Sequence, residues 1–218
     1  MNPYGSIAGF YDRWLRVAGF KRGVEQFLDR MELILPARPR VLDGGCGTGL
    51  ISLWLLRRFP DAHVTAFDID RKMLAVAARR ARRIAGARGR LTLAEGDLTA
   101  PRRLRGARGE AILLPEASFD LIVIGAALEH VPLASTLTGL HALLKPGGLF
   151  VNLGVRDASA AVVLGAVYQF RPYRTGELLE ALRGAGFAQA SVAPLALRDF
   201  PANLTRIAVS AVKPRAAA

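Results

Sequence analysis

A glycine-rich turn constrains the fold of this chain more than any other feature. The segment from residue 41 to 49 reads Val-Leu-Asp-Gly-Gly-Cys-Gly-Thr-Gly, between a short apolar run and a longer one at 48–59. Glycine lets the backbone turn sharply and approach a ligand closely, and a helix N-terminus offers unpaired N–H groups to an anionic group. We therefore expect a ligand site where a strand turns into a helix.

Strand-like and helix-like segments alternate along the rest of the chain. The predicted strands are 40–42, 63–67, 91–94, 119–124, 149–153, 190–197 and 206–212, and the predicted helices are 48–59, 70–85, 135–144 and 175–186. Alternation of this kind predicts an α/β protein with a doubly wound parallel sheet between two layers of helices. Ligands bind such sheets at the carboxyl ends of the strands.

Three carboxylates follow three consecutive predicted strands. Asp43 stands in the glycine turn, where it is expected to accept from an ammonium group; Asp68 closes the second strand, 19 residues after Gly49; Asp97 follows the third. An acid about 20 residues beyond a glycine turn is where a ribose diol is held, and Asp97 is expected to accept from the exocyclic amine of adenine. A dinucleotide fingerprint is absent, because it requires glycine where the chain has Leu50. The alternative is turn chemistry alone, but the three spacings together favour a nucleoside ligand.

In these residues and in several later segments, the sequence resembles the class I S-adenosylmethionine-dependent methyltransferases over about residues 4–212. The matching segments are 43–49, 68–74, 97–98, 114–120, 128–131, 143–148 and 173–187. The resemblance implies S-adenosylmethionine as the cofactor. It assigns the cofactor-binding role to Asp43, Gly44, Gly45, Gly47, Gly49, Asp68, Ile69, Met73, Asp97, Leu98 and Gly125.

The resemblance also implies an architecture. We expect a Rossmann-like sheet of seven strands in the order 3-2-1-4-5-7-6 with the last strand antiparallel. Residues 1–38 would form a helical N-terminal cap, 39–213 the methyltransferase domain, and 214–218 a frayed tail.

The implied reaction is displacement of a methyl group from a sulfonium by a nucleophile of the acceptor. Orienting the two reactants supplies up to about 7–11 kcal/mol of the barrier, and a base is needed only if the nucleophile carries a proton. His130, six residues past the fourth predicted strand, is the candidate base, and the adjacent Glu129 is a candidate to assist it. The alternative is that His130 caps or packs under a helix. No further ligand accompanies this pair, so no metal is predicted.

The acceptor is less constrained than the cofactor. The segment 4–14 resembles the cap of a branch that includes quinone and phospholipid methyltransferases, and the segment 158–173 is apolar. We expect a small, partly apolar acceptor, methylated on O, N or C, that contacts Tyr11, Tyr168 and Arg171. Both segments could equally be ordinary packing. Two alternatives stay open: an RNA or protein methyltransferase that uses the arginine-rich face, and a non-catalytic cofactor-binding scaffold.

The net charge of +12 raises the question of an anionic partner. One arc of a predicted helix carries Arg79, Arg80, Arg82 and Arg83, and this pattern predicts a solvent-exposed face. The basic insertion 99–112 is expected to be a mobile loop or a hairpin, and it lacks stacking aromatics, which disfavours nucleic acid. Peripheral contact with lipid and the oligomeric state stay open. Without a signal peptide or a stretch of ~20 apolar residues, the expected location is cytoplasmic.

Overall fold

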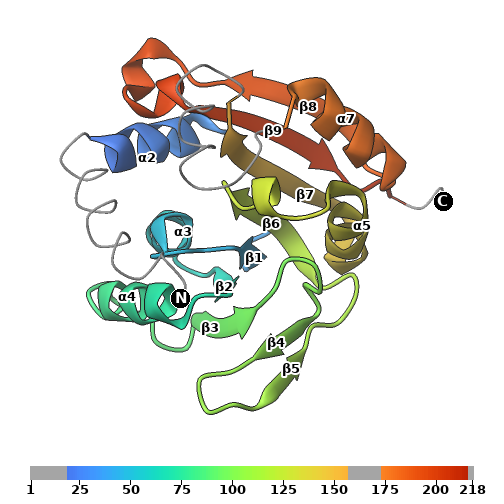
Figure 1. The fold of residues 1–218 in the computed structure, drawn as a ribbon. Coiled ribbons are helices and arrows are strands. Elements are labelled where there is room, and N and C mark those ends of the chain that lie inside the picture. Colours follow the sequence, from blue (N-terminus) through green and yellow to red (C-terminus); the bar gives the residue numbers. More distant parts are fainter. Residues whose placement is uncertain (1–18, 157–172, 216–218) are drawn as a thin grey trace, which may run out of the picture.

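The computed structural model describes residues 19–156 and 173–215 (Figure 1). In this part of the chain a single sheet has the strand order β5-β4-β3-β2-β1-β6-β7-β9-β8. Its strands are β1 Arg40–Gly44, β2 His63–Asp68, β3 Leu91–Gly96, β4 Arg103–Arg105, β5 Ala111–Leu113, β6 Phe119–Gly125, β7 Leu144–Val155, β8 Ala188–Pro194 and β9 Arg206–Val212.

Helices cover both faces of this sheet. The helices are α2 Phe20–Arg30, α3 Leu50–Arg58, α4 Arg71–Ala81, α5 Leu133–Leu143 and α7 Thr175–Gly184, with short 3-10 helices η1 Leu128–His130, η2 Leu197–Asp199 and η3 Ala202–Leu204. One apolar cluster joins α2 and α3 to one face of the sheet, and a second joins α5 and α7 to the other face. The central strands lie between them, and Val41, Leu42 and Leu121 are completely buried. This is why their sequences are almost continuously apolar.

The expected seven-stranded sheet is corrected to nine strands. The basic insertion 99–112 supplies most of the two additional strands, because it folds into the antiparallel hairpin β4–β5, which pairs with the edge of β3. The other strands follow one another as β3-β2-β1-β6-β7-β9-β8, and β9 runs antiparallel to both of its neighbours. Leu104 attaches the hairpin: it is buried and lies so close to Gly96 that a Cβ there would be 2.3 Å from its Cδ2.

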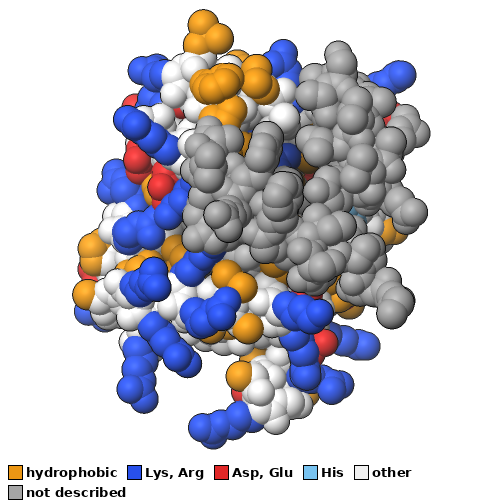
Figure 2. All heavy atoms as spheres, turned by 60° about the vertical axis from the view of Figure 1, so that its left-hand side comes forward, with side chains coloured by type: hydrophobic (Ala, Val, Ile, Leu, Met, Phe, Trp, Pro, Cys, Tyr) orange, Lys and Arg blue, Asp and Glu red, His pale blue; other side chains and the backbone are white. Residues whose placement is uncertain are grey.

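The arginine-rich helix departs from its predicted character at one position. Arg79, Arg82 and Arg83 are exposed, as expected of a solvated face, but Arg80 is half-buried. Its Nη1 donates to the Oγ1 of Thr48 at 2.7 Å, so it braces the glycine turn against α4. Figure 2 shows Lys and Arg side chains spread over much of the visible surface rather than gathered in one patch.

The helix α2 is fixed to the C-terminal part of the chain. Gly23 lies against η2, where a Cβ would be 2.2 Å from the carbonyl oxygen of Asp199. Arg30 donates to both carboxylate oxygens of Asp199, which is completely buried. Residues 31–38 of the predicted helical cap form neither helix nor strand, and residues 1–18, which include Tyr11, lie outside the described residues, as do Tyr168 and Arg171.

Candidate functional site

The glycine turn after β1 adopts a conformation that only glycine accommodates easily. Gly45, Gly47 and Gly49 have φ angles of 65°, 52° and 83°, in the left-handed region. At Gly45 there is also no room, because a Cβ would lie 2.5 Å from the Cβ of Ala127. The turn therefore passes directly over the end of β6 and leaves its backbone exposed to a ligand.

The turn is held in place by the neighbouring strand. The backbone N–H of Gly47 donates to the Oδ2 of Asp68 at 2.7 Å, and that of Cys46 donates to the carbonyl of Phe67 at 2.9 Å. Asp68 also accepts from the backbone N–H of Asp70 at 2.9 Å. Burial raises the pKa of Asp68. Each carboxylate oxygen has two lone pairs, so both keep acceptor capacity for the hydroxyls of a ligand.

Asp43 is the buried charge of the site. It is 1% exposed, and its Oδ2 accepts from the backbone N–H of Ser52 at 3.0 Å and from the hydroxyl of the same residue. Its Oδ1 has no hydrogen-bond partner among the described residues. Burial in this apolar setting raises the pKa of Asp43 to about 7. A cationic group of a ligand at Oδ1 would supply the missing partner and stabilise the ionised form.

Asp97, at the end of the third strand, completes a row of three carboxylates along one edge of the sheet. Asp43, Asp68 and Asp97 lie at the carboxyl ends of β1, β2 and β3, which are adjacent in the sheet. Asp97 is exposed and accepts from the backbone N–H of Thr99 at 2.8 Å. The predicted apolar partners lie along the same edge: Leu98 is buried, Met73 is half-buried, and the side chain of Ile69 is 68% exposed. An exposed isoleucine beside acceptors is suited to a flat, apolar ring with polar edges.

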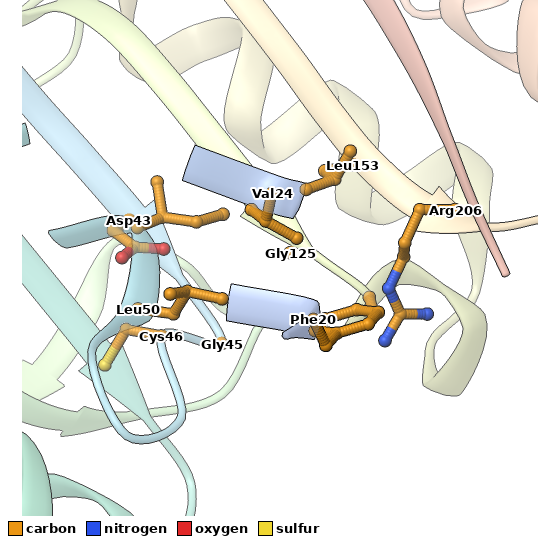
Figure 3. A pocket seen from close by; sticks show the side chains of 11 residues that line it. Phe20, Val24, Asp43, Gly45, Cys46, Leu50, Gly125, Leu153 and Arg206 are labelled. Atoms are coloured by element: carbon orange, nitrogen blue, oxygen red, sulfur yellow. The ribbon is translucent and has the colours of Figure 1, made fainter. Parts of the chain in front are cut away.

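A cavity of about 80 Å³ lies beside the glycine turn (Figure 3). Asp43 lies at one side of it and Arg206 of β9 at the other, with Phe20 and Val24 of α2 between them. Gly45, Gly125 and Leu153 complete its apolar and backbone walls. The guanidinium of Arg206 lies 5.2 Å from the ring centroid of Phe20. Asp68 and Asp97 are not among the lining residues, so the cavity covers only one end of the row.

Glu129 and His130 follow β6 in the 3-10 helix η1. The side chain of His130 is exposed, whereas Glu129 is buried and its Oε1 accepts from the backbone N–H of Val155, at the end of β7. The other oxygen of Glu129 has no hydrogen-bond partner within 19–156 and 173–215. Nearby, the hydroxyl of Tyr173 donates to the carbonyl of Val131, and burial raises the pKa of that hydroxyl. These contacts fix η1 over the ends of β6 and β7.

Several residues of the site were not singled out from the sequence. Ser52 and Thr48 hold the turn through contacts of single hydroxyls, and Phe20 and Arg206 reach it from distant parts of the chain. No local pattern marks them, because each acts through a contact made only in the folded chain. Over the described ranges, no group of three or more His, Cys, Asp or Glu side chains is placed to hold a metal. No helix in those ranges is long and apolar enough to cross a membrane.

Comparison with known proteins agrees with this geometry. The family described as a methyltransferase domain matches residues 41–148. A demethylmenaquinone methyltransferase of Leptospira interrogans serogroup Icterohaemorrhagiae serovar copenhageni is 37% identical over 156 residues, which are 70% of this chain and 58% of the relative. A ubiquinone biosynthesis O-methyltransferase of Xylella fastidiosa is 36% identical over 155 residues, 68% of this chain and 57% of the relative. The chain thus spans less than three fifths of the length of either relative.

A solved structure shares the fold. The geranyl diphosphate C-methyltransferase of Streptomyces coelicolor A3(2), determined with Mg²⁺, geranyl diphosphate and S-adenosylhomocysteine, superposes with a TM-score of 0.70 at 13% identity, over 88% of this chain and 80% of that one. The sheet and the glycine turn define an α/β protein of the class I methyltransferase fold. Within that class, the match of residues 41–148 to the methyltransferase-domain family places the chain among the S-adenosylmethionine-dependent methyltransferases.

Proposed function

We propose that this chain transfers a methyl group from S-adenosylmethionine to a small, partly apolar acceptor. The observation that carries the proposal is the row of carboxylates at the ends of β1, β2 and β3, with one buried oxygen of Asp43 lacking a partner among the described residues. The cofactor has the matching groups in the matching order: an ammonium for Asp43, a ribose diol for Asp68, and an adenine amine for Asp97. The adenine ring would lie against Ile69, Met73 and Leu98.

The glycine turn would supply the remaining contacts to the amino-acid end of the cofactor. Gly45 and Gly125 line the cavity and, because glycine has no side chain, present only backbone atoms to it. The sulfonium lies between the amino-acid end and the ribose of this cofactor, so its methyl group would face the ends of β6 and β7. In the reaction, a lone pair of the acceptor forms the new bond to the methyl carbon as the carbon–sulfur bond breaks. S-adenosylhomocysteine is the product, and catalysis rests on orientation.

The base, if the acceptor carries a proton, would be His130. Its exposed side chain lies on η1, beyond the end of β6. We infer a positioning role for Glu129, because its carboxylate is already bound to the backbone N–H of Val155 and ties η1 to β7. A hydroxyl acceptor would require this base, whereas an amine that is already neutral would not.

The acceptor would occupy the side of the cavity away from Asp43. Arg206 stands on β9, three strands from β1 in the sheet order. Neighbouring strands are about 4.8 Å apart, so the backbones at the two positions are at least roughly 14 Å apart across the sheet. We assign Arg206 to a polar or anionic group of the acceptor, and Phe20 and Leu153 to its apolar part. The quinone-related names of the relatives support an acceptor of this kind.

Transfer of a labelled methyl group tests the function. The protein is incubated with methyl-labelled S-adenosylmethionine and a lysate, and the product is fractionated into lipid, small-molecule, RNA and protein pools. We expect label in the lipid or small-molecule pool. Label confined to the RNA or protein pool would contradict the proposed small-molecule acceptor and identify RNA or protein as the acceptor class. Binding of cofactor without label in any pool would identify a scaffold.

A further inference from the structure

Three apolar side chains project into solvent from one short stretch of the chain. Leu197 is 87% exposed, Phe200 63% and Leu204 52%. They lie on and between η2 and η3, and we call them the apolar platform. Figure 2 shows hydrophobic side chains gathered at the top of the molecule, where Figure 1 places these helices. Soluble proteins rarely leave large apolar side chains clustered in water without a binding role.

The exposure of the platform is built into the fold. The residues interleaved with it point inward: Asp199 and Ala202 are completely buried and Asn203 is 8% exposed. Asp199 accepts from Arg30 of α2 and from the backbone N–H of Ala196 at 2.7 Å. A stretch held this firmly from beneath presents its outer side chains in a fixed arrangement.

Cations lie on the two helices that form and support the platform, η2 and α2. Arg22 on α2 and Arg198 on η2 are exposed, and the exposed Lys21 lies 3.7 Å from a carboxylate oxygen of Glu25. The amide of Gln26, turned to satisfy both groups, accepts from the Nε of Arg22 at 3.2 Å and donates to the carbonyl of Arg198 at 3.1 Å, which places α2 and η2 side by side. The one acid within the stretch, Asp199, is buried and paired with Arg30. The whole chain carries a net charge of +12.

We propose that the apolar platform docks this protein on the surface of an anionic lipid bilayer. Apolar side chains flanked by cations match a bilayer, where the side chains enter the acyl boundary and the cations meet lipid phosphates. The platform also adjoins the cavity: Phe20 begins the helix on which η2 rests, and Arg206 stands two residues beyond η3. Docking would bring the cavity close to the bilayer, where partly apolar acceptors concentrate.

Vesicle binding of the full chain tests the proposal independently of methyl transfer. Flotation with phosphatidylglycerol-containing vesicles is compared with flotation on phosphatidylcholine alone. We expect binding to the anionic vesicles that weakens with added salt. The combined Leu197→Gln, Phe200→Gln and Leu204→Gln variant should bind at least about tenfold more weakly. Leu113→Gln is the matched control, because Leu113 is 65% exposed on β5 at the opposite edge of the sheet.

Two further measurements keep the result interpretable. Thermal unfolding and S-adenosylhomocysteine binding of the combined variant report whether it remains folded, and the single Phe200→Gln variant replaces it if it does not. Arg22→Gln with Arg198→Gln should weaken binding to anionic vesicles only. Equal binding by the wild type and the platform variant, or no binding by either, overturns the proposal. So does a platform-dependent dimer in solution that excludes vesicles, because the surface would then serve a second copy of the chain.

Discussion

Replacing Asp43 by Asn probes the buried charge on which the cofactor assignment depends. The pKa of Asp43 is raised to about 7 in the folded protein, against about 3.9 in an unfolded chain. Between these values the native carboxyl keeps a proton that the unfolded chain has lost, so the stability of the apo protein falls as the pH rises through this window. Each pH unit inside the window lowers the free energy of unfolding by about 1.4 kcal/mol. From pH 5 to pH 8 the loss due to Asp43 is therefore roughly 3 kcal/mol.

The amide of the Asp43→Asn variant does not titrate, so this loss should disappear. Urea unfolding of both proteins is measured at pH 5 and pH 8. The free energy of unfolding of the variant, relative to the wild type, should rise by roughly 3 kcal/mol between the two values. Fixed costs of the amide, such as weaker bonds to Ser52, cancel in this comparison. A difference that stays constant with pH would refute the raised pKa and the reasoning built on it.

The same charge links cofactor binding to proton release. If a ligand ammonium pairs with Asp43, binding favours its ionised form and expels the proton that it holds near pH 6. Titration of S-adenosylhomocysteine in buffers of different ionisation heat should show proton release at pH 6 and almost none at pH 8, and the Asp43→Asn variant should release none by this route. Identical behaviour of the two proteins would mean that the ligand does not reach Asp43.

Three further substitutions test the glycine turn, the hairpin and the acceptor side of the cavity. Gly45→Ala sets a Cβ 2.5 Å from the Cβ of Ala127 at a positive φ. It should lower the free energy of unfolding by about 1–3 kcal/mol and weaken the binding of S-adenosylhomocysteine. Gly109→Ala, at a position with a positive φ but open space, is the control and should leave that affinity unchanged. Leu104→Ala removes the buried anchor of the β4–β5 hairpin and should cost about 2–5 kcal/mol in urea unfolding; a cost below about 0.5 kcal/mol would show that the hairpin is held otherwise. Arg206→Gln should leave S-adenosylhomocysteine affinity unchanged and raise the KM for the acceptor about tenfold or more. Weaker S-adenosylhomocysteine binding instead would assign Arg206 to the cofactor site.

The sequence predicted the carboxylate row because its geometry is nearly local. Asp43, Asp68 and Asp97 each follow a strand at once, and adjacent parallel strands bring their carboxyl ends to the same edge. The glycine turn is local as well, since its three positive φ angles belong to consecutive odd positions of one segment. Strand-end residues of such sheets can therefore be assigned from the order of residues along the chain.

Other features depend on contacts between distant residues. The ion pair of Arg30 with Asp199 joins residues 169 positions apart, and no pattern near either one announces it. The hairpin strands β4 and β5 are three residues each, which is too short for an alternation signal, and the buried Leu104 anchors them. Helix periodicity predicted a solvent-exposed Arg80, because periodicity shows only which face of the helix a residue occupies. It does not show that the glycine turn packs against the edge of that face and contacts Arg80.

Calorimetric titration of S-adenosylhomocysteine into the wild type and into Asp68→Ala tests the central claim most directly. Asp68 carries the predicted ribose contact and also accepts from the backbone N–H groups of Gly47 and Asp70, so the variant should lose about 1–3 kcal/mol of stability, remain folded, and bind the ligand at least about tenfold more weakly. Asp61→Ala, at an exposed position before β2, serves as the control and should bind as the wild type does. No heat of binding with the wild type, or equal affinity of the wild type and Asp68→Ala, would contradict the assignment of this sheet edge to the cofactor.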